Sequence, residues 1–193
     1  MKLLAERKTE HTLAYVSIFA QGRCRNSIVR QFLQIGMIRY YNDSINYRLR
    51  DKRKIARWVE AIAEAEGFVA GDINYIFCSS EVHRKMNIDF VGHDYFTDII
   101  TFDYSDRKGT KIVAGDVFID VDTVADNARI YGTTKTNEMH RIIAHGVLHL
   151  CGQKDKTERA EKQMHRKEDK YLKLLEQFLI QNSKFKIQNW VLN

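Results

Sequence analysis

The sequence predicts an α+β fold: a small mixed sheet of about four strands, packed by about five helices, with a metal site on a buried helix. Two observations lead to this class. Short apolar runs typical of strands occur between segments with helical spacing, in the order strand, helix, strand, helix, two strands, helices. Residues 137–151 are apolar on most of the helix circumference, which is typical of a buried helix.

The strands are expected first around an Asn42-Asp43-Ser44 turn, at 38–41 and 45–49, and then at 72–78, 98–104 and 115–121. The helices are expected at 53–66, 79–87, 123–131, 137–151 and 158–181. Ser80 is available to cap the second helix, and Gly152 is a plausible end for the fourth.

The chain divides into three expected regions. Residues 1–36 read as an N-terminal extension, disordered or outside the native start, and a signal peptide is disfavoured because its apolar stretch is only about nine residues. Residues 37–182 form the expected metal-dependent domain, and residues 183–193 a C-terminal tail that is a short strand or a frayed end. The net charge of +6 is uneven, since residues 1–36 hold six Lys/Arg and two Glu, net +4. Charge alone therefore does not indicate a nucleic-acid partner.

The three cysteines are widely spaced, odd in number and form no CxxC pair. This pattern favours unpaired thiols in a reducing compartment, and hence a cytoplasmic protein. No apolar run approaches the ~18–20 residues that a membrane span needs, so no membrane partner is expected.

Two histidines on the buried helix suggest a metal site. His145 and His149 are four residues apart, so their side chains lie on one helix face, about 6 Å apart along the axis. Two imidazoles placed in this way can bind one ion. The pair taken alone is equally compatible with two hydrogen-bonded core histidines.

The residues after the helix favour the metal. Gly152 can adopt positive φ and reverse the chain, which brings Asp155 back over the helix face. His145, His149 and Asp155 would then hold one zinc ion and leave a coordination position open, as catalytic zinc sites do. Iron, nickel and manganese accept the same ligands. Cys151 is interpreted as a buried apolar neighbour rather than a fourth ligand.

A metallopeptidase is one alternative, because metzincin proteases share the H-x3-H-x2-G spacing. Those enzymes carry a glutamate general base directly after the first histidine, where this chain has Gly146. The sequence therefore disfavours a peptidase.

Three blocks of the chain resemble the YbeY-type single-strand-specific endoribonucleases. The first is H-G-V-L-H-L-C-G-Q-K-D at residues 145–155, the second runs from Asn87 to Phe102, and the third is G-D-V-F-I at 115–119. Their order and spacing match over roughly residues 37–171. Three departures are notable: Asp155 stands where the family usually has a third histidine, Gln153 where it usually has a tyrosine, and Val91 where it usually has an arginine.

The resemblance implies a hydrolase, a zinc-dependent endoribonuclease acting in maturation of the 16S rRNA 3′ end and in ribosome quality control. Its implied partners are single-stranded RNA, rRNA and the ribosomal subunit. A non-enzymatic ribosome-assembly factor with a structural zinc is a further alternative, in which Cys151 would have to be the fourth ligand. The catalytic candidates beside the metal are Asp98, His93 and Arg141, and the candidates for substrate binding are Lys156, Arg159 and Thr97.

Overall fold

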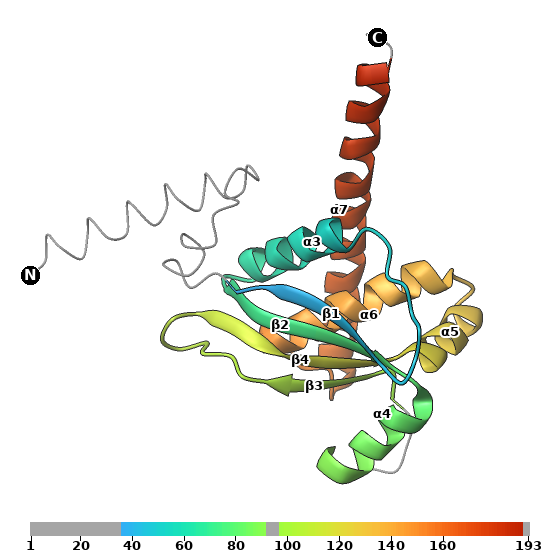
Figure 1. Ribbon diagram of the computed structural model, residues 1–193. Helices are drawn as coiled ribbons and strands as arrows, with labels where there is room; N and C mark the ends of the chain where they lie inside the picture. The colour runs from blue at the N-terminus through green and yellow to red at the C-terminus, as the bar shows by residue number, and fades with distance from the viewer. Residues whose placement is uncertain (1–35, 92–96, 191–193) are drawn as a thin grey trace, which may run out of the picture. The chain divides into compact units, whose positions relative to one another are not determined.

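In the computed structural model, a four-stranded sheet forms the centre of the part of the chain that is described, residues 36–91 and 97–190 (Figure 1). The strand order is β1-β2-β4-β3. β2 is parallel to both β1 and β4, and β3 is antiparallel to β4. The strands are β1 (Ile38–Asp43), β2 (Val69–Cys78), β3 (Ile99–Asp103) and β4 (Ile112–Asp120).

Helices cover one face of this sheet. Three helices pack against one another on that face, labelled α3, α6 and α7 in Figure 1. α3 connects β1 to β2, α6 carries His145 and His149, and α7 is the last helix. The helices are α3 (Lys52–Ala65), α4 (Ser80–Met86) with the π-helical turn η1 (Asn87–Val91), α5 (Val121–Ile130), α6 (Lys135–Leu150) and α7 (Glu158–Trp190). Four strands and five α-helices in the described residues confirm the predicted α+β class.

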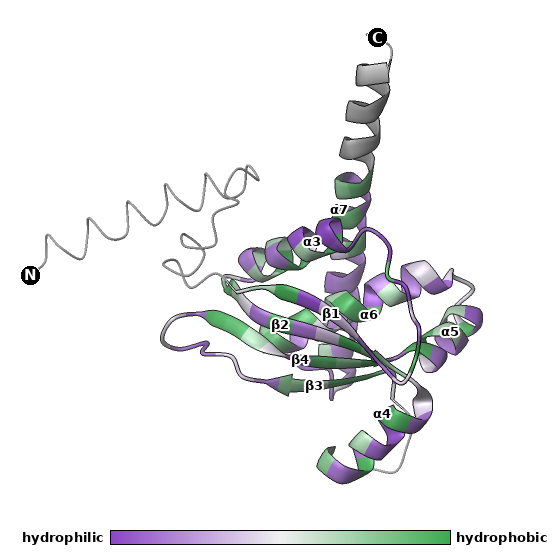
Figure 2. Cartoon of the chain, in the orientation of Figure 1, coloured by the Kyte–Doolittle hydropathy of each residue, from purple (hydrophilic) through white to green (hydrophobic). Residues whose placement is uncertain are grey.

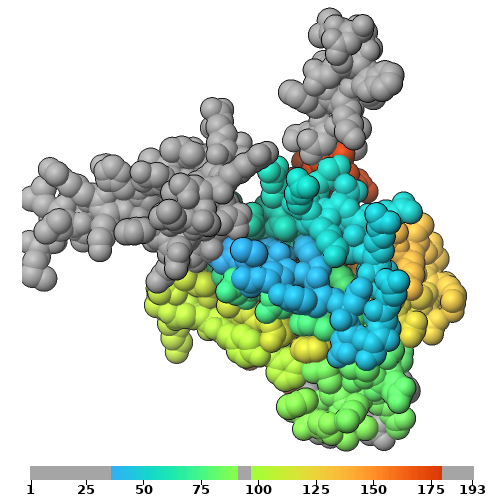
Figure 3. Space-filling view, in the orientation of Figure 1, coloured from blue at the N-terminus to red at the C-terminus, as the bar shows by residue number. Residues whose placement is uncertain are grey.

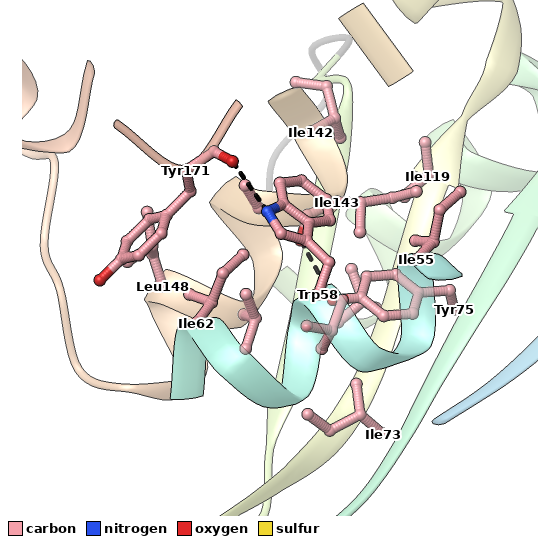
Figure 4. Packing of buried hydrophobic residues seen from close by; sticks show 14 of the residues in the cluster. Ile55, Trp58, Ile62, Ile73, Tyr75, Ile119, Ile142, Ile143, Leu148 and Tyr171 are labelled. Carbon is pink, nitrogen blue, oxygen red and sulfur yellow. Dashed lines mark hydrogen bonds between the residues drawn. The ribbon is translucent and has the colours of Figure 1, made fainter. Parts of the chain in front are cut away.

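The core lies between the sheet and these helices. α3 and α7 alternate between hydrophobic and hydrophilic residues, as expected of helices with one buried face (Figure 2). Trp58 of α3 is fully buried, and its indole N–H donates to the Tyr171 carbonyl of α7 at 2.8 Å (Figure 4). The Tyr75 hydroxyl of β2 donates to the Ile143 carbonyl of α6 at 3.0 Å. These bonds satisfy buried polar groups, and they join α7 to α3 and α6 to the sheet.

The predicted hairpin at residues 38–49 is wrong. β1 pairs in parallel with β2 after the crossover through α3, and residues 45–49 form no strand. Their alternating apolar pattern has another cause: Leu49 is buried and the Tyr47 ring packs on Phe77, with ring centroids 4.8 Å apart. The segment thus buries apolar side chains without a strand partner. The backbone itself runs over the surface, where Figure 3 shows this part of the chain in blue.

Two element ends also differ from the prediction. Ser79, not Ser80, caps α4, and Ser80 instead donates to Asp120 at 2.9 Å. α7 continues to Trp190, where a strand or a frayed end was expected. No described helix combines the length and the apolar character that crossing a bilayer requires. The predicted extension lies outside the described residues except for Gly36.

Candidate metal centre

Helix α6 carries the two histidines along the covered face of the sheet. It begins where the Thr134 side chain accepts a hydrogen bond from the Asn137 amide. Ile143, Val147 and Leu148 are fully buried and hold the helix against the core. His145 and His149 lie at the edge of this buried stripe, with side-chain exposures of 16% and 25%. Their rings meet edge to face, with centroids 4.4 Å apart.

The turn after α6 brings Asp155 back to the helix. Gly152 has φ +90°, and its N–H donates to the His149 carbonyl while the Gln153 N–H donates to the Leu148 carbonyl. This pair of bonds is a Schellman motif, which ends a helix with a glycine in the left-handed region. Since the chain reverses here, a residue three positions later can face the histidines.

The three predicted metal ligands converge. One Asp155 oxygen, Oδ2, lies 3.6 Å from His145 Nε2 and 3.3 Å from His149 Nε2. The ligand atoms of all three side chains lie within 4.8 Å of one another. Donors ~2.0–2.1 Å from one tetrahedral ion would be roughly 3.4 Å apart, so the donor spacing fits a single divalent ion.

Hydrogen bonds also set the correct tautomer of His149. Its Nδ1 lies 2.9 Å from the Gln153 carbonyl oxygen. A carbonyl can only accept, so Nδ1 carries the proton and the Nε2 lone pair faces Asp155. Burial lowers the pKa of His149 below its ordinary value, and the neighbouring His145 lowers it further. The ring is therefore held in the neutral form that binds metals.

His145 is held by a carboxylate on another helix. Its Nδ1 lies 2.7 Å from Glu168 Oε1 of α7, so Nδ1–H donates and Nε2 is again free to bind. Burial alone would lower the pKa of His145, but the hydrogen bond and charge of Glu168 raise it above its ordinary value. A metal that bound at Nε2 would therefore have to displace a proton from this ring.

Glu168 is a further candidate residue of this site that the sequence analysis did not identify. Its side chain is 1% exposed and also accepts from Arg141 Nη1 at 3.1 Å and from His165 Nδ1 at 3.0 Å. Burial would raise its pKa, but these donors, with His145 first, hold the pKa at about 2. The one signal in the sequence is its position seven residues after Glu161, which places both carboxylates on one face of the predicted last helix.

A cleft of about 570 Å³ opens beside His145 and Asp155. It lies between the end of α5, the exposed side of α6 and the first turns of α7. Its lining is acidic, and Arg141 is the one Lys or Arg among the described lining residues. The acidic lining residues are Asp98, Glu138, Asp155, Glu161, Glu168 and Asp169.

The structure places two of the three catalytic candidates in this cleft. Asp98 lines it, and Asn127 donates to Asp98 Oδ2 at 3.1 Å. Arg141 lines it too, but its guanidinium is bound by Glu168 and by Asp169, at 3.1 and 2.8 Å. His93 lies outside the described residues.

The candidates for substrate binding are more scattered. Thr97 is half-buried, and its hydroxyl donates to the Ile99 carbonyl at 3.3 Å. Lys156 and Arg159 are exposed at the start of α7 and are not among the lining residues of the cleft. Their role in binding a substrate stays a prediction.

The position after the first histidine has a structural reason to be glycine. A Cβ on Gly146 would lie 2.8 Å from Val117 Cγ1 and 3.1 Å from Ile99 Cδ1, because α6 approaches the sheet closely here. A glutamate at this position would point into the sheet, away from Asp155. The geometry thus strengthens the argument against a peptidase of the HExxH type. Cys151 is half-buried and is not part of the ligand cluster found in the described residues.

Gly152→Ala is expected to weaken both the fold and the metal site. An L-residue at φ +90° costs about 1–2 kcal/mol, and the strain falls on the turn that positions Asp155. We expect a lower free energy of unfolding in urea and a weaker metal affinity in a chelator competition.

Gly67→Ala is the matched control. Gly67 follows α3 at φ +87°, and an added Cβ there meets nothing within 4 Å. It should lose a similar amount of stability and keep wild-type metal affinity. Equal metal affinities in the two variants would show that the Gly152 turn does not position the ligand.

Comparison with known proteins identifies the family of this chain. The family model described as "Endoribonuclease YbeY" matches residues 38–176. An endoribonuclease YbeY of Cytophaga hutchinsonii is 46% identical over 135 residues, covering 70% of this chain and 93% of the relative. One of Parabacteroides distasonis is 44% identical over 138 residues, covering 72% and 95%.

A solved structure is also similar. The solution structure of TM1509 from Thermotoga maritima superimposes with a TM-score of 0.51 at 25% identity, covering 76% of this chain and 93% of that one. The family match includes α6, the turn at Gly152, Asp155 and Glu168. This chain belongs to the endoribonuclease YbeY family.

Proposed function

We propose that the chain is a single-strand-specific endoribonuclease that depends on one zinc ion held by His145, His149 and Asp155. The observation that carries the proposal is the convergence of both Nε2 atoms on Asp155 beside an open cleft. The name shared by the relatives supports RNA as the substrate.

In this proposal, the side chains of the site have separate roles in phosphodiester hydrolysis. When bound, a divalent ion there supplies a water of lowered pKa and polarises a phosphoryl oxygen. His145 and His149 present fixed lone pairs, and Glu168 keeps His145 in place. Asp98, oriented by Asn127 on the cleft wall, is the proposed proton acceptor. The Asp98→Asn variant should then cleave unpaired RNA more slowly than wild type, with the same metal content.

We further propose that the substrate is rRNA, with the 3′ end of 16S rRNA as the site of maturation and the ribosomal subunit as the partner. The resemblance to YbeY-type enzymes supports this assignment. A cytoplasmic location is proposed on the same ground, and the free thiols of Cys78 and Cys151 fit a reducing compartment.

The function is tested with purified protein and two labelled RNAs, one unpaired and one fully duplexed. We expect cleavage of the unpaired RNA, loss of cleavage after chelation, and recovery on adding Zn²⁺. A casein substrate is the control for peptidase activity and should stay intact. Cleavage that persists after complete removal of metal would refute a metal-dependent mechanism.

A further inference from the structure

One part of the cleft is not used by the metal ligands. It is lined by Tyr131, Thr133 and Glu138, which come from the corner that joins α5 to α6. Gly132 at φ +64° turns the chain there, and Thr134 starts α6. The corner therefore places an aromatic ring, a hydroxyl and a carboxylate on the wall of one cleft.

Glu138 is a buried carboxylate that lacks hydrogen-bond donors. Its side chain is 3% exposed, no described residue donates to it, and its nearest cation is Arg141 Nε at 3.8 Å. Glu168, the other buried glutamate, receives three donors. Burial raises the pKa of Glu138; the charge of Arg141 opposes this shift, and the charges of Asp98 and Glu168 add to it. Its carboxylate opens onto the cleft and is not among the buried polar atoms that lack a partner, so a ligand that enters the cleft with hydrogen-bond donors can reach it.

The distance from Glu138 to the candidate metal ligand His145 is close to the length of one nucleotide. Glu138 and His145 are seven residues apart on α6, so they share a helix face with an axial separation of about 10 Å. This span is comparable to that from a phosphate to the Watson–Crick edge of a neighbouring base. A phosphate at His145 would thus bring a flanking base to Glu138.

Tyr131 supplies a surface for such a base. It caps the C-terminal end of α5, is 69% exposed, and lines the same cleft. Unpaired bases in RNA complexes commonly stack on exposed aromatic rings while their edges are hydrogen-bonded. An exposed tyrosine and a carboxylate that accepts no hydrogen bond from the described residues line the same cleft, and together they can provide both contacts.

We propose that this corner is a guanine-binding subsite, in which Glu138 accepts hydrogen bonds from N1–H and N2–H₂ of a base that flanks the scissile phosphate. Guanine presents these two donors side by side. Adenine and cytosine pair one amino donor with a ring acceptor, and uracil flanks its one donor with carbonyls, so both arrangements oppose a carboxylate. The inference rests on the proposed function and adds a base preference to it.

The test compares cut sites in a pool of random single-stranded RNA, using the full chain with saturating Zn²⁺. Wild type should prefer guanine at one position flanking the cut by about tenfold, the size of a good two-bond contact. Glu138→Gln should still cut and lose this preference. Glu158→Gln, on an exposed turn of α7, should keep it. No guanine preference in wild type, or an unchanged one in Glu138→Gln, would overturn the proposal.

Binding of 5′-GMP and 5′-UMP, measured by titration calorimetry without cleavage, separates this inference from the proposed function. Wild type should bind GMP more tightly, Glu138→Gln should not discriminate, and Tyr131→Phe should resemble wild type more than Tyr131→Ala does. A protein that discriminates GMP but cuts no RNA would refute the endoribonuclease alone. If Glu138→Gln only lowers Tm and still discriminates, Glu138 has a structural role and the subsite is wrong.

Discussion

His149→Ala is expected to lower the rate of RNA cleavage by about a thousandfold. The variant removes one of the three proposed ligands, with the Nε2 atom that lies 3.3 Å from Asp155 Oδ2. Metal ions contribute several kcal/mol of transition-state stabilisation in hydrolysis, and each 1.36 kcal/mol is tenfold in rate. Single-turnover cleavage of unpaired RNA, with protein in excess, measures the effect directly.

The control for this variant is His140→Ala on the same helix. His140 faces α3, where its ring contacts Trp58 edge-on with centroids 6.3 Å apart. We expect it to lower Tm because packing is lost, and to keep both its metal and its cleavage rate once folded. If His149→Ala cleaves at the wild-type rate while His140→Ala does not, the assignment of the reacting centre is wrong.

Glu168→Gln should give the next largest effect, a 10- to 100-fold loss of metal affinity. Glutamine keeps the size of the side chain but removes its negative charge. That charge stabilises the hydrogen bond between His145 Nδ1 and Glu168 Oε1, which are 2.7 Å apart. Carboxylates that orient a ligating histidine typically contribute this much to affinity. Competition with a chelator of known zinc affinity gives the two dissociation constants.

Glu176→Gln is the matched control, because Glu176 lies on the same helix and is exposed. It should bind metal as wild type does. Wild-type affinity in Glu168→Gln would mean that Glu168 only joins α7 to α6 through Arg141. In that case the variant should lose stability and leave the site unchanged.

The convergence of the three candidate ligands could be predicted because the information for it is local. His145 and His149 depend on helix periodicity, and Asp155 depends on a glycine turn, all within eleven residues. The buried helix and the α+β class followed from patterns of the same short range. These are the features that propensity and hydrophobic spacing determine.

The features that were missed depend on contacts between distant segments. The Asn42-Asp43-Ser44 turn residues suggested a hairpin, but β1 pairs with β2 across 35 positions of the chain, through α3. Glu168 reaches His145 from another helix, and Glu138 lines a cleft together with residues of α5 and α7. Sequence spacing carries no record of such contacts. The charged sequence of α7 therefore does not indicate that one of its carboxylates, Glu168, is 1% exposed.

Elemental analysis of the purified wild-type chain beside Asp155→Ala tests the central claim most directly. Asp155 Oδ2 is the atom on which both Nε2 atoms converge, and it is the ligand that departs from the usual histidine. We expect close to one zinc per wild-type chain and strongly reduced zinc in Asp155→Ala, with cleavage falling in parallel. Equal zinc in both proteins, with equal cleavage of unpaired RNA, would contradict a His145–His149–Asp155 metal centre.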